Sequence, residues 1–134
     1  MKTEQSKLKF KNIIMPEIKD NKYGKTLFYI EGNEIKESKY GKTLFYIDGA
    51  EVKENSKYGS VKFYIDGHEI KEKSKYGNVR YYVDGSEVKD KSKYGSLSFF
   101  IDGSEIKDKK FGNVKYFIDG SLIRDQLYGF LSII

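Results

Sequence analysis

The sequence has no cysteine, no tryptophan, a single proline and no long apolar run. Without cysteine, a disulfide scaffold, a thiolate metal site and a thiol nucleophile are excluded. Charged residues interrupt every apolar run well before the roughly 18 residues of a membrane span, so we expect no membrane partner. Residues 1–7 are polar and lack the apolar core of a secretory signal, which predicts a cytoplasmic protein, or a cell-surface one if a leader was removed.

Aromatic and charged residues are plentiful. The 134 residues include 12 Tyr and 9 Phe, 34% are charged, and the formal net charge is +5. Chains that stay unfolded are poor in aromatic and β-branched residues, so this chain is expected to fold, as one domain over residues 1–134.

Internal repetition dominates the sequence, and glycine marks it. An aromatic-Gly pair, usually preceded by Lys, recurs every 17 or 18 residues, at residues 22–24, 39–41, 57–59, 75–77, 93–95, 110–112 and 127–129. An acidic-Gly pair lies between successive copies, from Glu31-Gly32 to Asp119-Gly120, and the two sets account for all 13 glycines. Two glycines per repeat predict two backbone positions per repeat with positive φ.

The segments between the glycines have the composition of strands. In the third copy, Val61–Asp66 and His68–Glu72 flank Gly67, and Asp-Gly between two such runs predicts a β-hairpin with a type I′ turn. That turn pairs Ile65 with His68 and Phe63 with Ile70. Alternation then places Val61, Phe63, Ile65 and Ile70 on a buried face, and Lys62, Tyr64, Glu69 and Lys71 on the other face. The equivalent buried residues are Phe45, Ile47, Val52, Tyr81, Val83, Val88, Phe99, Ile101, Ile106, Tyr116, Ile118 and Ile123.

The predicted fold class is all-β, built of tandem 17–18-residue β-hairpin repeats that form a meander. Residues 1–21 form a cap and partial repeat, 22–126 six hairpin repeats, and 127–134 a C-terminal partial repeat. The half repeats at residues 17–21 and 130–134 can pair and close the sheet, or residues 8–14 can form a first strand of an open array. The apolar stripe must be covered, by closure into a barrel or flattened sandwich, by coiling into a β-solenoid, or by a second chain. No segment has the length and period of a helix.

The run of aromatic pair, turn glycine and apolar residue at 81–88 resembles the β-hairpin repeats of bacterial cell-wall-binding modules of the choline-binding type. The Lys-Tyr-Gly element also resembles bacterial repeats with a Trp-Gly or Lys-Trp-Gly signature. The likeness spans residues 22–129. It implies a bacterial repeat protein built of hairpins, and no binding residue is carried over from either family.

No catalytic, cofactor or metal site is predicted. The only histidine, His68, stands beside a turn where other copies have Asn, Ala or Ser, and is interpreted as a surface substitution. One carboxylate in each Asp-Gly turn is what the turn itself requires, so these residues are not interpreted as acids or calcium ligands. The protein is expected not to be an enzyme.

Two surfaces are candidates for interaction. Tyr29, Tyr46, Tyr64 and Tyr82 form a predicted ladder on the outer face, flanked by lysines and lying across from Glu34, Glu51, Glu69, Glu87 and Glu105. If the hairpins form one meander, Lys39, Lys57, Lys75, Lys93 and Lys110 form a cationic row along one edge, with neighbours about 9.6 Å apart. The acidic turns form a row along the opposite edge.

Three functions are compatible with these surfaces. The leading hypothesis is a non-enzymatic repeat scaffold for protein interaction or self-assembly. A carbohydrate or cell-wall binding module comes second, favoured if Tyr rings stand in clefts between hairpins. Binding of a polyanion such as nucleic acid through the Lys and Tyr surface comes third, because opposite charges across a strand pair usually only stabilise a solvated face.

Overall fold

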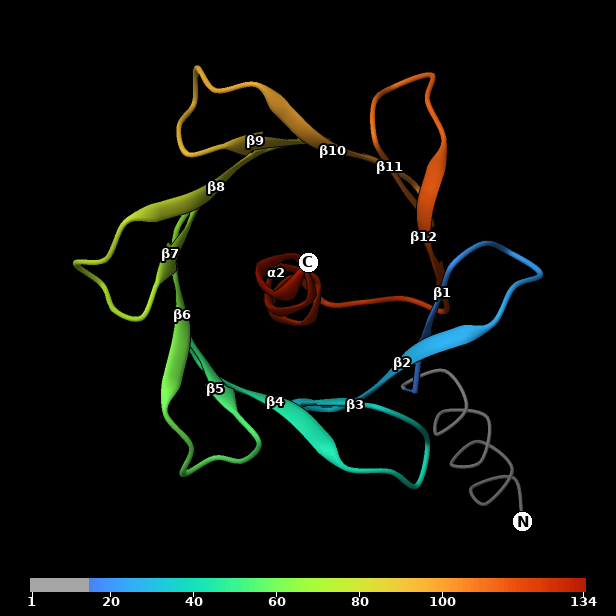
Figure 1. The fold of residues 1–134 in the computed structure, drawn as a ribbon, viewed down its shortest axis with the longest axis vertical. Helices are drawn as coiled ribbons and strands as arrows, with labels where there is room; N and C mark the ends of the chain where they lie inside the picture. The colour runs from blue at the N-terminus through green and yellow to red at the C-terminus, as the bar shows by residue number, and fades with distance from the viewer. Residues whose placement is uncertain (1–14) are drawn as a thin grey trace, which may run out of the picture.

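In a computed structural model, which describes residues 15–134, twelve antiparallel strands close into a barrel that surrounds one helix (Figure 1). The all-β meander is confirmed, and it is the closed form. The elements are β1 (Glu17–Lys19), β2 (Thr26–Glu31), β3 (Glu34–Lys36), β4 (Thr43–Asp48), β5 (Glu51–Glu54), β6 (Val61–Asp66), β7 (Glu69–Glu72), β8 (Val79–Asp84), β9 (Glu87–Asp90), β10 (Leu97–Asp102), β11 (Glu105–Lys107), β12 (Val114–Asp119) and α2 (Arg124–Ile133). The alternative first strand over residues 8–14 lies outside the described residues.

Each hairpin pairs in a register two residues away from the predicted one. In β6 and β7, Ile65 lies opposite Ile70 and Asp66 opposite Glu69, so Gly67 and His68 form the turn instead of Asp66 and Gly67. Only the glycine has positive φ, +61° at Gly67, which fits a type II′ turn and not type I′. A shift of two residues keeps every side chain on its predicted face, because side chains alternate with period two.

The six Lys-aromatic-Gly segments form loops between hairpins, and their glycines do not have positive φ. The prediction of positive φ at both glycine positions is therefore wrong for this set. At Gly59 a Cβ atom would overlap the carbonyl oxygen of Glu54, so the loop requires glycine for space. The extra residue of the 18-residue copies takes the positive φ instead, at Asn55, Lys73 and Lys91. The change of spacing is thus absorbed within the loop, as predicted.

The core is the predicted apolar face. Ile18, Ile30, Ile35, Ile47, Val52, Ile65, Ile70, Tyr81, Val83, Val88, Ile106 and Ile118 are buried, and Phe28, Phe45, Phe63, Phe99, Ile101 and Tyr116 pack against them. The first residues of the long strands depart from this pattern. A register shift places Val61 opposite the outward Lys53, so its assignment to the buried face is wrong. The bulge explains the change, because one additional residue interrupts the alternation.

The N-terminal strand closes the barrel. In β1, Glu17, Ile18 and Lys19 lie opposite Asp119, Ile118 and Phe117, as Glu105, Ile106 and Lys107 lie opposite Asp102, Ile101 and Phe100 in a complete hairpin. Thus β1 takes the place of a second strand in the sixth repeat. The prediction that residues up to 126 supply that strand is wrong: Ile123, assigned to the core, is 66% exposed. The segment 121–124 lacks the Glu-Ile-Lys pattern that β1 shares with β3 and β11.

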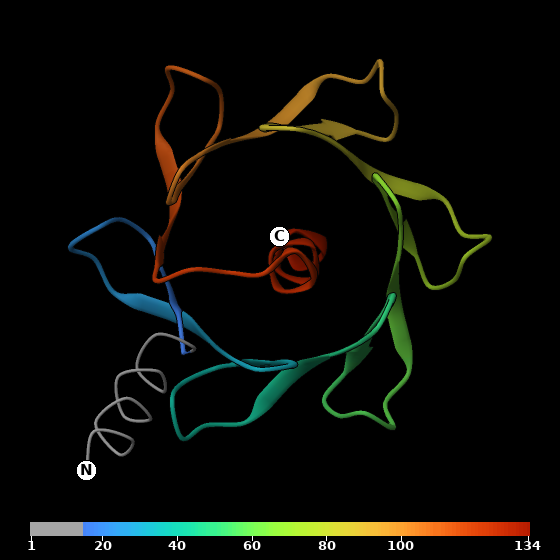
Figure 2. The same cartoon turned by 180° about the vertical axis from the view of Figure 1, so that it is seen from behind.

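The C-terminal segment is a helix and not a partial repeat. It enters the barrel from one end, where Gln126 and Arg124 donate to the carbonyl oxygens of Gly32 (3.0 Å) and Gly67 (2.7 Å) (Figure 2). Phe130 and Leu131 are fully buried against the inner faces of the strands. Inside an apolar lumen a segment must satisfy its own backbone hydrogen bonds, which a helix does and a single strand does not. The open array and the strand at 130–134 are therefore both excluded.

Candidate functional site

The barrel has two different ends. The acidic-Gly pairs lie at one end, here called the turn end, and the six loops that carry an aromatic-Gly pair (20–25, 37–42, 55–60, 73–78, 91–96 and 108–113) lie at the other, the loop end. This follows from the antiparallel order of the strands. The loops project outward from the barrel wall, away from the barrel axis (Figure 1).

The predicted tyrosine ladder lies on the outer wall. Tyr64 stands opposite Glu51 on one side and Lys71 on the other, and Tyr29, Tyr46 and Tyr82 each lie opposite a lysine of the following strand. All four tyrosines are half-buried. Tyr46 also accepts a long hydrogen bond from Asn33, 3.5 Å. The ladder is present, but its rings are flanked by charged side chains on both sides.

The lysines on this outer wall form ion pairs. Lys53 Nζ lies 2.8 Å from Asp48 and also donates to the carbonyl oxygen of Lys57, 2.9 Å away. Lys71 repeats both contacts, with Asp66 and with the carbonyl oxygen of Lys75. Equivalent ion pairs join Lys19 to Asp119, Lys36 to Glu31, Lys89 to Asp84 and Lys107 to Asp102. The carboxylate before each turn glycine is therefore paired with a lysine of the adjacent strand.

These contacts shift pKa values in both partners. A hydrogen bond from Lys53, aided by its charge, lowers the pKa of Asp48 below its ordinary 3.8, and Lys71 does the same for Asp66. The hydrogen bonds to the carboxylates raise the pKa of Lys53 and Lys71 above 10.5. Both directions favour the charged form of each partner.

The loop end presents a ring of exposed aromatic side chains. Tyr23, Tyr40, Tyr58, Tyr76, Tyr94 and Phe111 are each about 90% exposed. Each occupies the same place in its loop, which is closed by a backbone hydrogen bond from the glycine, such as Gly59 N–H to Ser56 O, 2.9 Å. In three loops Ser Oγ also accepts from the N–H of the aromatic residue, as Ser74 does from Tyr76 at 3.2 Å. We call these six side chains the aromatic tips.

The predicted lysine row stands directly beside the aromatic tips. Lys39, Lys57, Lys75, Lys93 and Lys110 are exposed and each precedes a tip, with Lys22 as a sixth member. Lys39 Nζ lies 5.5 Å from the ring centre of Tyr40, and Lys110 Nζ lies 5.5 Å from that of Phe111. Within residues 15–134 none of these six lysines forms an ion pair.

Sequence reasoning treated the aromatic tips as turn punctuation and missed them as a surface. The available signal was residue type. Tight turns select Gly, Pro, Asn, Asp and Ser, so a Tyr or Phe at the same turn position in six copies is not explained by turn chemistry. These aromatic residues also lie between the predicted strands, so the alternation of buried and exposed side chains assigned none of them to the core.

The two ends differ in charge. Each position at the turn end brings two carboxylates and one ammonium, such as Asp66, Glu69 and Lys71, and the sixth is assembled from Asp119, Glu17 and Lys19. At the loop end, five of the six loops carry two basic residues, and only three of these five also carry a carboxylate. The loops are therefore more basic than the turn end, and the two lie close together on the outer wall, where Lys53 and Lys71 each bridge a turn carboxylate and the carbonyl oxygen of a loop lysine.

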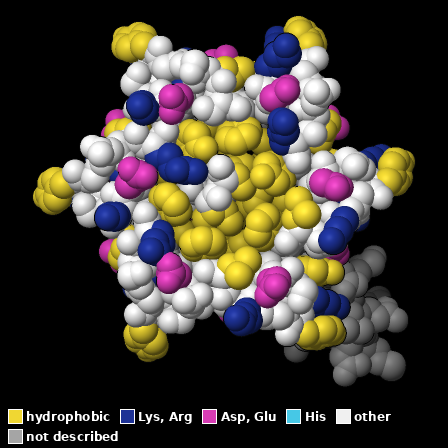
Figure 3. All heavy atoms as spheres, in the orientation of Figure 1, with side chains coloured by type: hydrophobic (Ala, Val, Ile, Leu, Met, Phe, Trp, Pro, Cys, Tyr) yellow, Lys and Arg dark blue, Asp and Glu magenta, His cyan; other side chains and the backbone are white. Residues whose placement is uncertain are grey.

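Viewed from the loop end, apolar side chains fill the centre of the face, basic and acidic side chains surround them, and an apolar tip marks each of six corners (Figure 3). Ile133 and Ile134, at the end of the helix, are partly exposed. Arg80 Nη2 lies 3.4 Å from the carbonyl oxygen of Ile134. The face is thus amphipathic.

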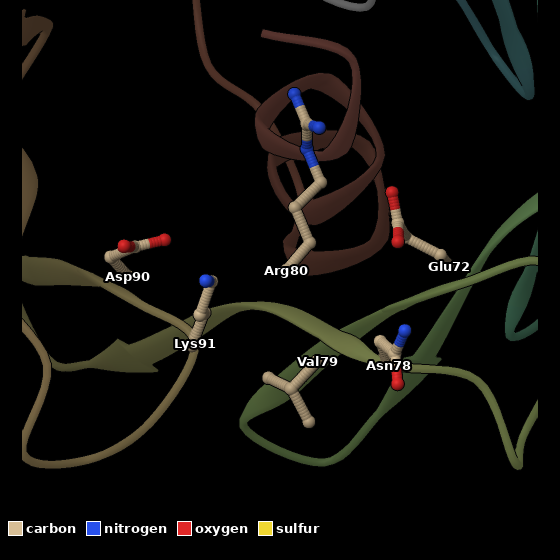
Figure 4. A pocket seen from close by; sticks show the side chains of 6 residues that line it. All are labelled: Glu72, Asn78, Val79, Arg80, Asp90 and Lys91. Carbon is tan, nitrogen blue, oxygen red and sulfur yellow. The ribbon is translucent and has the colours of Figure 1, made fainter.

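A cavity of about 700 Å³ in this face is lined by Glu72, Asn78, Val79, Arg80, Asp90 and Lys91 (Figure 4). The Arg80 guanidinium lies over the rings of Phe63 (5.5 Å) and Tyr81 (5.1 Å) and points along the helix, between the carboxylates of Glu72 and Asp90. Other copies have Leu, Lys or Ser in place of Arg80. We interpret Arg80 as a tether for the end of the helix.

His68 lies at the turn end, exposed, with Nδ1 3.1 Å from the carbonyl oxygen of Val83 and its ring 5.6 Å from that of Tyr82. Residues 15–134 contain no group of three or more His, Cys, Asp or Glu side chains that could hold a metal ion. In the same range no helix has the length and apolar character needed to cross a membrane. Comparisons with protein-family models, curated proteins and solved structures found no match for this chain.

Proposed function

We propose that the protein is a non-enzymatic repeat scaffold that binds its partner through the loop end, with the six loops acting as equivalent, simultaneous contacts. The observation that carries this proposal is the exposure of the aromatic tips, about 90% at each of six equivalent positions. An aromatic ring that lies outside the core can bury its apolar surface only when a partner covers it. Tyr is also among the residues enriched in binding surfaces.

Multivalency makes weak single contacts sufficient. Closure of the barrel fixes the loops relative to one another, so that after the first loop binds, the others meet the partner at high effective concentration. The ordering cost is small, because the loops are already held by backbone hydrogen bonds such as that from Gly77 to Ser74, 2.9 Å.

A matched pair of proteins tests this function. The native chain and a variant with all six aromatic tips changed to Ser are immobilised and exposed in parallel to polysaccharide, single-stranded nucleic acid, lipid vesicles and a protein lysate. We expect one class to be retained by the native chain and lost from the variant, with intermediate retention when three tips are changed. If the variant and the native chain retain the same classes equally, or neither retains any, the proposal is wrong.

End-to-end self-assembly is a second candidate, supported by the opposite charge of the two ends. The unpaired loop lysines of one copy would meet the carboxylates at the turn end of the next. Such a contact is exposed to solvent and should weaken as salt shortens the Debye length to about 8 Å at 0.15 M. Changing Lys39, Lys57, Lys75, Lys93 and Lys110 to Glu should abolish association measured by sedimentation velocity at low salt. A native chain that is monomeric at every salt concentration contradicts this candidate.

A further inference from the structure

The structure points to an anionic lipid bilayer as the partner of the loop end, and we propose that the protein binds such a surface peripherally through the aromatic tips and their neighbouring lysines. This inference rests on the proposed function, since it assigns the partner of the same surface. It departs from the sequence-based expectation of no membrane partner, which concerned a membrane span. Peripheral binding requires no span.

The chemistry of each loop fits the headgroup region. A tyrosine ring has an apolar body and a polar end, and such rings concentrate where a membrane meets water. An ammonium group stands beside three of the six rings, with Nζ to ring-centre distances of 5.6 Å for Lys22 and Tyr23 and 5.5 Å both for Lys39 and Tyr40 and for Lys110 and Phe111. Because the loop lysines form no ion pair within residues 15–134, lipid phosphates can pair with them without breaking an ion pair.

The arrangement of the tips favours a bilayer over a folded protein. The six tips stand apart at the corners of the face, separated from one another and from its apolar centre by charged side chains (Figure 3), so a folded protein would need a separate pocket for each tip. A fluid surface accepts each tip independently and needs no matching pocket. The tips also do not stand in clefts between hairpins, which was the condition that would have favoured a carbohydrate ligand.

Charge polarity sets the orientation. The turn end, with two carboxylates and one lysine at each position, is repelled by anionic lipid, while the loop end is attracted. The long-range field and the aromatic anchors therefore act in the same direction. The barrel axis would stand along the membrane normal, with the turn end facing water.

Fluorescence offers a direct test, because the chain has no tryptophan. Two single-tryptophan variants are prepared: Tyr76→Trp at an aromatic tip, and Ser86→Trp at the turn end, where the equivalent His68 shows that a ring is accommodated. Each is mixed with vesicles of phosphatidylcholine containing one quarter phosphatidylserine, and with vesicles of phosphatidylcholine alone. We expect a blue shift for Tyr76→Trp with the anionic vesicles only, and none for Ser86→Trp.

Co-sedimentation with the same vesicles measures affinity. Each Lys→Glu change at a loop should weaken binding by at least about fivefold, the effect of one basic residue at an anionic surface. The variant with six Ser tips should lose binding while its circular dichroism is unchanged. Absence of native binding, equal shifts at both tryptophan positions, or undiminished binding by the Ser variant overturns the inference. If vesicles fail but nucleic acid, polysaccharide or protein is retained only by the native chain, the lipid assignment falls and the proposed function stands.

Discussion

Two kinds of glycine hold each repeat in shape, for different physical reasons. Gly85, in an acidic-Gly turn, has φ of +61° and open space where a Cβ would lie. Gly77, in an aromatic-Gly loop, has an ordinary φ, but a Cβ there would overlap the carbonyl oxygen of Glu72. The first glycine is a conformational requirement and the second a steric one. Side chains that tolerate the left-handed region therefore fit only the first site.

Substitution by Ala and by Asn separates the two roles. Gly85→Ala should cost about 1–2 kcal/mol, the penalty of a left-handed residue, and Gly85→Asn less, because Asn visits this region readily. Gly77→Ala should cost about 1–3 kcal/mol from overpacking, and Asn should bring no relief. Urea unfolding of the four variants measures these differences. If the Asn variant is more stable than the Ala variant by the same amount at Gly77 as at Gly85, the steric explanation for Gly77 is contradicted.

The ion pairs of the outer wall predict how stability depends on pH. Lys71 lowers the pKa of Asp66 below 3.8 in the folded state, so this contribution is complete above that pH and is lost as the pH falls through the folded pKa. The pKa of Lys71 is raised above 10.5 in the folded state, so the pair contributes its full stability below pH 10.5. That contribution is lost as the pH rises through the folded pKa of Lys71. In Lys71→Met, the free energy of unfolding should therefore depend less on pH than in the native chain, both at low pH and at high pH.

Urea midpoints between pH 2 and pH 7 for the native chain and Lys71→Met test the acid side. Lys93→Met is the control, since Lys93 forms no ion pair within residues 15–134 and should leave the shape of the curve unchanged. The Asp66 side chain of the pair is 43% exposed, so the effect should be modest and should shrink at high salt. A curve for Lys71→Met that parallels the native one would show that the pair contributes nothing.

At the scale of elements, the strands follow from local sequence and the helix does not. The alternation in Phe63, Tyr64 and Ile65 fixes which side chains are buried whatever the register, so the core was predictable even though the turn was placed one residue early. Residues 127–129 repeat the aromatic-Gly pair and thus imitate a loop. Their helical state depends on an apolar lumen that exists only after the other strands have closed, and no local pattern reports that environment.

In the candidate site, one set of side chains could be predicted from the sequence and the other could not. Its lysines were predictable, because a charge at a repeated turn must lie at one edge of the sheet. The aromatic tips were not singled out, since the repeated Tyr was interpreted as part of the turn, and only the three-dimensional loop shows residues such as Tyr58 and Tyr76 to be 90–92% exposed.

Packing of α2 accounts for a measurable part of stability. Phe130 is fully buried and meets the rings of Phe28 and Tyr116 edge-on, with centres 5.6 and 5.3 Å apart. Phe130→Ala should therefore cost about 3–5 kcal/mol in urea unfolding. Ile123→Ala, at the exposed start of the helix, should change stability by less than about 0.5 kcal/mol. Similar losses for the two variants would indicate that the helix does not sit in the lumen.

For the whole molecule, the decisive contact joins the two ends of the sheet. Pairing of β1 with β12 leaves no free strand edge in the barrel, and a free edge is the usual site of unwanted strand association. The contact spans most of the sequence, from Glu17 to Asp119. All other strand pairs join neighbours in sequence.

An engineered disulfide tests this closure, and the absence of native cysteine makes the result unambiguous. Glu17 and Asp119 are direct partners, at the short Cα separation that a disulfide bridges. The variant Glu17→Cys/Asp119→Cys should oxidise within one chain and migrate faster on a non-reducing gel. Glu17→Cys/Glu105→Cys, whose positions are not partners, should not. Equal cross-linking of the two variants, or none in the first, would contradict a closed ring.

Ring closure also constrains how the chain can fold during synthesis. Hairpins from β2 to β11 are local, so each can form soon after its residues leave the ribosome. The strand β1 is made first but has its second partner only when β12 emerges, and α2 follows later still. Until then the nascent sheet has two unpaired edges and an empty apolar interior. The slow and aggregation-prone interval of folding therefore lasts until β12 and α2 have been synthesised, and a chain stalled before residue 119 should need a chaperone that a chain with a closed barrel does not.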